Sequence, residues 1–449
     1  MHSDFLLKDA LSRQLFESVK DLPIIDWHNH LSINDLSSDR HYHDLCELWV
    51  ASDPYKHRAM RICGVPERFI TGESTSYEKF KAWSWTLPQL VGNPLYDWSA
   101  MELQRIFGIE EPLAPVSAEK VWKNANERLS ENGFSALGLL ERFNVEYAAP
   151  CMTLGEPLEP FDGLASLVPS LRGDDLLAMT NPVFSEVQTL PELWSRLESD
   201  IRRLHSAGCR FADHALDNGF RYVPNDGQNE RRFSQFKHGS LALSERQALS
   251  CEILRNLAAL YSQHGWTLQL HIGAQRMTSS RLRTAAGPAG GYASIGNACE
   301  LSSLTALLND LERSDAGLPR VILYTLNPTA HAMFAVLSGS FTGDGIRGKV
   351  TLGPAWWYCD HIHGMKDCFE NIAAYGVLSV FPGMTTDSRS LLSFVRHEYF
   401  RRVFCAWLAE KAARDEMPSD IAILTHLAEK VCHLNAKSLV NNQTGGNWK

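Results

Sequence analysis

Residues 22–32, "LPIIDWHNHLS", place two histidines directly after an apolar run. In a β-strand, alternate side chains point to opposite faces, so His28 and His30 share one face together with Asp26. Two imidazoles on one face can hold one metal ion. The alternative is a pair of half-buried histidines that hydrogen-bond the backbone. A metal site therefore requires further ligands from other parts of the chain.

Composition bounds the class of protein. The chain has 449 residues, 44% hydrophobic and 10% aromatic, which suits one large domain with insertions or two to three ordinary domains. Its 52 acidic and 43 basic residues give a formal net charge of -9, which argues against general binding to nucleic acid or an anionic membrane. We find no signal-peptide pattern and no apolar membrane span. The ten cysteines form no Cys-x-x-Cys motif, so we expect reduced thiols and a cytoplasmic location.

Eight short apolar runs end in polar or glycine residues and are mostly separated by helical patterns. They are residues 22–30, 145–153, 167–172, 208–216, 266–276, 320–328, 349–357 and 376–389. Eight strands that alternate with helices predict an α/β fold, a (β/α)8 barrel of the TIM type. In such a barrel the catalytic residues lie at the carboxyl ends of the strands.

The first two runs are separated by roughly a hundred residues, too many for a plain connection within a barrel. We therefore predict three regions: an N-terminal helix and first strand (1–34), an inserted, mainly helical subdomain (35–140), and the remainder of the barrel with C-terminal helices (141–449). A Gly-, Ser- and Ala-rich stretch, 278–298, follows the fifth run. We expect it to form a mobile loop over the barrel mouth.

The last run supplies the missing metal ligand. In a closed barrel the last strand lies beside the first, so its tip "TTDSR" brings Asp387 and Arg389 close to His28 and His30. Two imidazoles and one carboxylate with open positions suit one divalent ion such as zinc. A second ion would need more ligands, and the runs at 208–216 and 320–328 do not supply them.

Several motifs carry a resemblance to a known family. They are "DFLLKDALSRQLF", "LPIIDWHNHLS", "SDPYKHRAMRICGV", "GNPLYDWSAMEL", "LQLHIGAQR", "LYTLNP", "GPAWWYCD" and "GMTTDSRSLLSFVRHEYFRR". Together they resemble the uronate isomerase, or glucuronate isomerase, family of the amidohydrolase superfamily, in the same order from residue 4 to residue 410. The resemblance implies interconversion of D-glucuronate with D-fructuronate and of D-galacturonate with D-tagaturonate.

The resemblance also implies roles for individual residues. It gives His28, His30 and Asp387 as the ligands of one divalent ion, with zinc expected. It gives Asp387, Tyr55 and His271 as catalytic residues, and it gives the substrate-binding residues as Arg172, Asp213, Arg276 and Arg389.

The chemistry explains why these residue types are needed. Moving a hydrogen between C1 and C2 of a sugar passes through an enediol or a metal-assisted hydride shift, and both need a cation at the adjacent oxygens. A carboxylate or phenol moves the protons. An arginine can bind the sugar's own carboxylate through two parallel hydrogen bonds.

Each residue also has a structural alternative. His271 can orient a neighbour, Asp213 can anchor a ligand or cap a helix, and Tyr55 can be a core phenol. Arg276 and Arg389 can belong to structural ion pairs.

The chain departs from the family pattern in two places. It has "PCMTL" at 150–154 where the family usually has "TTDDP", and "YASIGN" at 292–297 where the family usually has a sequence like "FDSIGD". The reaction class is therefore better supported than the substrate.

Two other functional classes remain: a metal-dependent hydrolase of a sugar-acid lactone or amide, and a non-catalytic sugar-acid binding protein. The expected partners are a sugar acid and further copies of the chain in a homo-oligomer.

Overall fold

A curled sheet of seven parallel strands forms the centre of the fold. The computed structural model describes residues 3–441. The strand order is β1-β2-β3-β4-β5-β8-β9. The strands are β1 (Ile24–Asn29), β2 (Val145–Met152), β3 (Ser170–Arg172), β4 (Phe211–Leu216), β5 (Thr267–Ile272), β8 (Arg320–Thr325) and β9 (Val350–Leu352). The first seven apolar runs each contain one of these strands, as the sequence predicted.

The curl of the sheet is visible in a buried chain of hydrogen bonds. Trp27 of β1 donates from Nε1 to the hydroxyl of Tyr324 on β8 over 2.9 Å, and that hydroxyl donates to Gln269 Oε1 on β5 over 2.7 Å. β1 and β8 are not neighbours in the sheet order. Their side chains meet because the sheet bends around a common interior, and the hydrogen bonds offset the cost of burying the indole N–H of Trp27 and the hydroxyl of Tyr324.

The eighth run forms no strand, so that part of the predicted barrel is wrong for the described residues. Residues 378–380 form a short 3-10 helix, and residues 381–389 have no regular structure. Pro382 has no backbone N–H to donate, and Gly383 and Asp387 have φ of +90° and +47°, outside the extended region that a strand needs. The run therefore cannot continue the sheet as a regular ladder.

Residues 385–388 are instead bonded to β1 by individual hydrogen bonds. The N–H of Asp387 donates to the carbonyl of His28 over 3.1 Å, and the N–H of His30 donates to the carbonyl of Ser388 over 2.9 Å. Below them, the fully buried carboxylate of Asp26 accepts the N–H of Thr386 at 2.7 Å. These bonds, which we call the polar seam, place residues 385–388 at the tip of β1.

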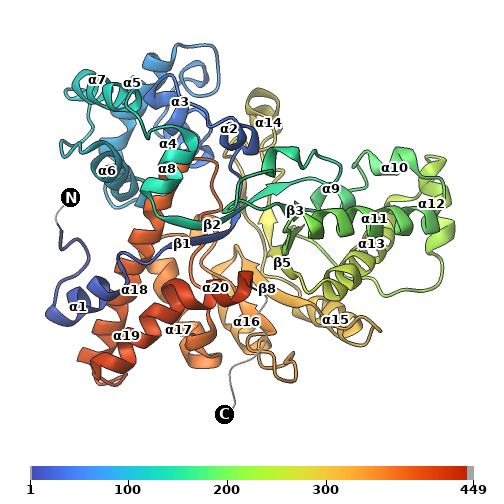
Figure 1. The fold of residues 1–449 in the computed structure, drawn as a ribbon. Helices are drawn as coiled ribbons and strands as arrows, with labels where there is room; N and C mark the ends of the chain where they lie inside the picture. Colours follow the sequence, from blue (N-terminus) through green and yellow to red (C-terminus); the bar gives the residue numbers. More distant parts are fainter. Residues whose placement is uncertain (1–2, 442–449) are drawn as a thin grey trace.

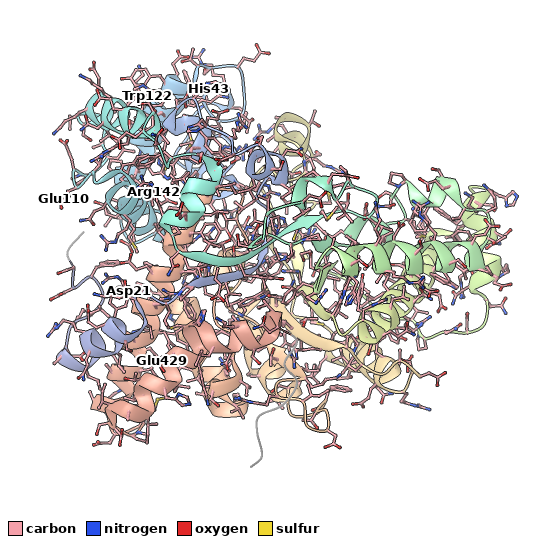
Figure 2. The ribbon with its side chains drawn as sticks, viewed as in Figure 1. Asp21, His43, Glu110, Trp122, Arg142 and Glu429 are labelled. Atoms are coloured by element: carbon pink, nitrogen blue, oxygen red, sulfur yellow. The ribbon has the colours of Figure 1, made fainter. Side chains whose placement is uncertain are left out.

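Between β1 and β2 the described chain forms seven α-helices, grouped on one side of the sheet (Figure 1). Figure 2 shows their side chains, with Trp122 labelled on α7 and Arg142 on α8. The helices are α2 (Ile33–Ser37), α3 (Leu45–Trp49), α4 (Pro54–Ile62), α5 (Ser76–Thr86), α6 (Pro94–Phe107), α7 (Ala118–Leu129) and α8 (Ala136–Arg142). The predicted stretch between the first two strands is thus helical, and its boundaries as a separate subdomain stay a prediction.

The remaining helices precede β1 or follow β3. They are α1 (Ala10–Val19), α9 (Asp174–Leu177), α10 (Val183–Glu186), α11 (Leu190–Ser206), α12 (Asn229–Lys237), α13 (Leu243–Gln263), α14 (Ser280–Ala286), α15 (Leu301–Glu312), α16 (His331–Leu337), α17 (Ile362–Tyr375), α18 (Val395–Ala413), α19 (Ile421–Glu429) and α20 (Asn435–Val440). Helix α13 packs against β5, and α16 packs against β9. Across residues 3–441, no helix has the length and apolar character that crossing a membrane requires.

Candidate active site

A cavity of about 300 Å³ lies at the carboxyl ends of the strands. All nine residues that the sequence singled out line it: His28, His30, Tyr55, Arg172, Asp213, His271, Arg276, Asp387 and Arg389. They come together because parallel strands end at the same edge of a sheet. The sequence did not single out Trp356, Trp357 and Asp174, which also line the cavity.

Asp387 forms the centre of a cluster with the two histidines of the opening motif. Its Oδ1 lies 3.2 Å from Nε2 of His28 and 3.0 Å from Nε2 of His30. Its Oδ2 accepts a hydrogen bond from Nε1 of Trp356 at 2.8 Å. The backbone of Asp387 is left-handed at φ +47°, a conformation that costs energy for a residue other than glycine and occurs often at functional sites. The polar seam holds it in this conformation.

Burial and neighbouring charged groups together set the charge state of the cluster. Burial lowers the pKa of His30 to about 3, and together with the charge of His28 it lowers the pKa of His271 well below its ordinary value. Burial also disfavours the charged forms of His28 and Asp387, but neighbouring groups have a larger, opposite effect on the pKa of each. Cys151, Asp213 and Asp387 raise the pKa of His28 well above its ordinary value, and the two histidines lower that of Asp387 well below its own. A cation bound at His28 would release its extra proton, because imidazole binds metals in its neutral form.

Two sets of side chains have ligand atoms within 4.8 Å of one another, and His28 belongs to both. One set is His28, His30 and Cys151, and the other is His28, Asp213 and His271. Nε2 of His271 is buried and has no hydrogen-bond partner among the described residues. A buried imidazole nitrogen without a partner is costly unless a ligand fills the position. The donor set, imidazoles beside a carboxylate, fits zinc or a similar divalent ion.

The three arginines of the cavity differ in their partners. Arg172 pairs with Asp174 at 2.9 Å, and its Nη1 lies 3.1 Å from Nε2 of His30. Arg276 pairs with Asp217 at 2.9 Å. Arg389 has no ion pair or hydrogen bond to a protein group within residues 3–441, although it lines the cavity. The side chain is exposed and makes no direct ion pair there, so its positive charge is accessible to an anionic ligand.

Tyr55 contributes a phenol with a buried hydroxyl to the cavity lining. It lies in the first turn of α4, which Asp53 caps by accepting the N–H of Tyr55 at 2.9 Å. Its hydroxyl has no hydrogen-bond partner among the described residues, and burial raises its pKa well above the ordinary value. The guanidinium of Arg396 faces the ring at 5.6 Å from its centroid. Tyr55 is therefore a neutral phenol with a free hydroxyl.

The glycine-rich stretch after β5 forms part of the cavity wall, as predicted, but it is not a plain loop, because it contains α14 (Ser280–Ala286) and the short strand β7 (Ser294–Ile295), which pairs with β6 (Ala274–Gln275). Ala289, Gly291 and Ala293 line the cavity. The loop is bonded to α4, because Arg58 donates to the carbonyl of Ala293 over 3.0 Å and Arg61 donates to the carbonyl of Gly290. Helix α4, which carries Tyr55, thus holds the loop over the cavity.

We expect Gly291→Ala to lower kcat/KM by about three- to tenfold, because Gly291 has φ +80° and an added Cβ would overlap the carbonyl oxygen of Pro54. The loop then has to move away from α4. Gly287→Ala is the matched control, since Gly287 has φ +73° but no atom near an added Cβ. Steady-state kinetics and tryptic cleavage after Arg281 measure both variants. Equal effects of the two substitutions would contradict a role for the α4 contact.

The fold and this cavity define the class of protein: an α/β enzyme whose polar site lies at the carboxyl ends of a curled parallel sheet. The sequence model of the glucuronate isomerase family matches residues 1–440. The chain belongs to the glucuronate isomerase family, and its membership confirms that it is an isomerase and that the resemblance of its motifs is real.

Similar proteins agree with this family. A uronate isomerase of Geobacillus thermodenitrificans is 38% identical, covering 96% of this chain and 97% of that protein. One from Haemophilus influenzae is 36% identical and covers 98% of each chain. The crystal structure of a uronate isomerase from Thermotoga maritima has a TM-score of 0.91 and 28% identity, with 98% of this chain and 99% of that chain covered.

Proposed function

We propose that the protein interconverts an aldohexuronate and its 2-keto isomer in this cavity: D-glucuronate with D-fructuronate, or D-galacturonate with D-tagaturonate. One observation supports the proposal most directly. The Asp387–histidine cluster and Arg389, which makes no direct ion pair among the described residues, line the same cavity of about 300 Å³. The cluster suits proton transfer beside a cation, and the arginine suits the carboxylate of a sugar acid.

His28, His30 and Asp387 would hold one divalent ion, with zinc the expected metal, and His271 offers its unpartnered Nε2 to the same space. When bound, such an ion stabilises negative charge on the neighbouring sugar oxygens. Trp356 fixes the second carboxylate oxygen of Asp387 and so orients the group toward the histidines. The carboxylate of Asp213 lies 4.0 Å from Nδ1 of His28 and 3.8 Å from Nδ1 of His271. Its negative charge therefore helps to orient both rings, and Asp213 also lines the cavity.

Asp387 and Tyr55 provide the proton transfers. In the enediol route, the carboxylate of Asp387 removes the hydrogen at C2 as a proton and returns it to C1. The hydroxyl of Tyr55 has no protein partner among the described residues. It donates a proton to the oxygen on C1 as the enediol forms, and it takes a proton from the oxygen on C2 as the ketose forms. Each proton removed is therefore returned, and the reaction needs no external oxidant or reductant.

Arg389 binds the substrate carboxylate. Arg172 and Arg276 are each partly neutralised by an aspartate, so they are better suited to orienting hydroxyl groups and the histidine cluster. This division of roles places the acidic end of the sugar at Arg389 and C1 and C2 at Asp387.

The metal assignment predicts about one divalent ion per chain in the purified protein, because three protein ligands with open positions complete one catalytic site. His28→Ala or His30→Ala should lower the occupancy. Metal analysis by mass spectrometry gives the stoichiometry, with His238→Ala, an exposed histidine on the surface, as the control. Two ions per chain, or unchanged occupancy in both variants, would contradict the assignment.

The function is tested by incubating metal-loaded protein with a panel of hexuronates in heavy water and following the products by NMR. Formation of a 2-ketouronate supports isomerisation, and deuterium at C1 of the ketose supports the enediol route. A ketose without deuterium supports a hydride shift instead. Release of a free acid from a lactone or amide, with no ketose from any hexuronate, would overturn the proposal in favour of a hydrolase.

We further propose the three-part division at residues 1–34, 35–140 and 141–449. We also propose a cytoplasmic homo-oligomer. Sedimentation velocity of the purified chain measures the oligomeric state, and a monomer at micromolar concentration would contradict the last point.

A further inference from the structure

We propose that the thiol of Cys151 is a positioning residue that fixes the tautomer of His28, so that Nε2 of this ring is free to bind a divalent ion. The inference rests on the metal site proposed above. It concerns a stretch, 150–154, in which this chain departs from the usual family pattern.

Cys151 lies between a metal-facing ring and a carboxylate. It is near the end of β2, where it pairs with Ser170 of β3. Its Sγ lies 3.4 Å from Nδ1 of His28 and 3.4 Å from Oδ1 of Asp213. Both distances are within the range of hydrogen bonds that involve sulfur. Asp213 is 2% exposed and His28 is 1% exposed, so both partners of the thiol are shielded from water, while Cys151 itself is partly exposed.

The direction of these two bonds follows from what each group can donate. The carboxylate of Asp213 only accepts, so the single thiol proton of Cys151 is donated to it. The sulfur is then left as an acceptor. The bond to His28 forms only if Nδ1 carries a hydrogen and donates it to sulfur. A neutral His28 with hydrogen on Nδ1 has its lone pair on Nε2, the atom that faces Asp387 at 3.2 Å.

Cys151 belongs, with His28 and His30, to one of the two sets whose ligand atoms lie within 4.8 Å of one another, but the position of Asp387 favours a positioning role over direct ligation. The two nitrogens of an imidazole point away from each other, and Cys151 is on the Nδ1 side of His28 while Asp387 is on the Nε2 side. An ion held by Nε2 therefore lies across the ring from the sulfur. Partners on the far nitrogen of a ligating histidine fix its orientation, and their loss typically lowers metal affinity by about 10- to 100-fold.

Zinc affinity tests the proposal through competition with a chromogenic chelator. Cys151→Ala removes both hydrogen bonds and should weaken zinc binding about tenfold, at the lower end of the range for such partners because the sulfur bonds are weak. Cys151→Ser keeps a donor and an acceptor and should restore affinity to within about threefold of the wild type. Cys299→Ala, which changes a thiol outside the cavity, is the control.

Nitrogen-15 NMR of the histidine rings tests the tautomer in the wild-type protein, without any substitution. We expect the zinc-loaded protein to carry hydrogen on Nδ1 of His28 and none on Nε2. The opposite tautomer would overturn the proposal, as would zinc affinity that is unchanged in Cys151→Ala. A thiolate-to-metal charge-transfer band in the cobalt-loaded wild type would also overturn it, because it would make Cys151 a ligand. If the wild type binds no zinc, the proposed metal site itself fails, which these measurements separate from a failure of the Cys151 role.

Discussion

Asp387→Asn is expected to lower kcat by at least about 100-fold while the fold and part of the metal binding remain, since one general acid or base typically contributes a factor of that size or more. The amide has nearly the shape of the carboxylate and can still accept from Trp356, whose Nε1 lies 2.8 Å from Oδ2. It cannot take a proton from C2 of the sugar. The backbone bond from residue 387 to the carbonyl of His28 does not depend on the side chain.

The measurement is kcat with the best hexuronate substrate, together with circular dichroism and metal content of the same preparation. Asp174→Asn is the matched control, because Asp174 also lines the cavity but contacts Arg172 and not the histidine cluster. A much smaller loss is expected there. Full turnover by the Asp387→Asn variant would refute Asp387 as the base.

Arg389→Lys is expected to lower kcat/KM by roughly ten- to a hundredfold, because losing a charge-assisted hydrogen bond typically costs about 1.5–3 kcal/mol. Lysine keeps the charge but presents one ammonium where guanidinium presents two parallel donors. The effect should exceed that of Arg276→Lys, because Asp217 already neutralises Arg276 at 2.9 Å. Arg389 has no such partner among residues 3–441, so its removal leaves no protein group unpaired.

Steady-state kinetics on one hexuronate distinguishes these variants, and Arg281→Lys, an exposed arginine on α14, is the control. Thermal unfolding of each variant should match the wild type. Near-wild-type kcat/KM for Arg389→Lys would mean that the substrate carboxylate binds at another group. An equal loss for Arg276→Lys would mean that both arginines share it.

The parts of the fold that could be predicted from the sequence depend on local patterns. The apolar run before His28 predicts a buried strand because its residues favour strands whatever surrounds them. The run at 376–389 is apolar too, but Pro382 and the left-handed Asp387 interrupt it, and the need for that conformation comes from contacts with β1. Such contacts lie far away in the sequence, so no local pattern signals them.

Prediction of the site from the sequence is limited in the same way. His28, His30 and Asp387 were predictable because their residue types suit a metal and their runs end at the same edge of the sheet. Cys151 carried no comparable signal, since a single thiol suggests a role only once Asp213 and His28 are known to lie 3.4 Å from it. The partners of the arginines also could not be predicted, because Asp217 and Asp174 are two of many acidic residues in the chain.

The polar seam makes the order of synthesis matter for this protein. Thr385 and Asp26, which meet in the seam, are 359 residues apart in the chain. A ribosome therefore exposes His28 and His30 long before their carboxylate partner exists, and contacts of such long sequence separation form late in folding. A message cut short between the codons for residues 30 and 387 would yield a chain with both histidines but without the carboxylate of Asp387. If the proposed metal site is correct, such products should be unable to retain a divalent ion, and this would distinguish unfinished chains from finished ones.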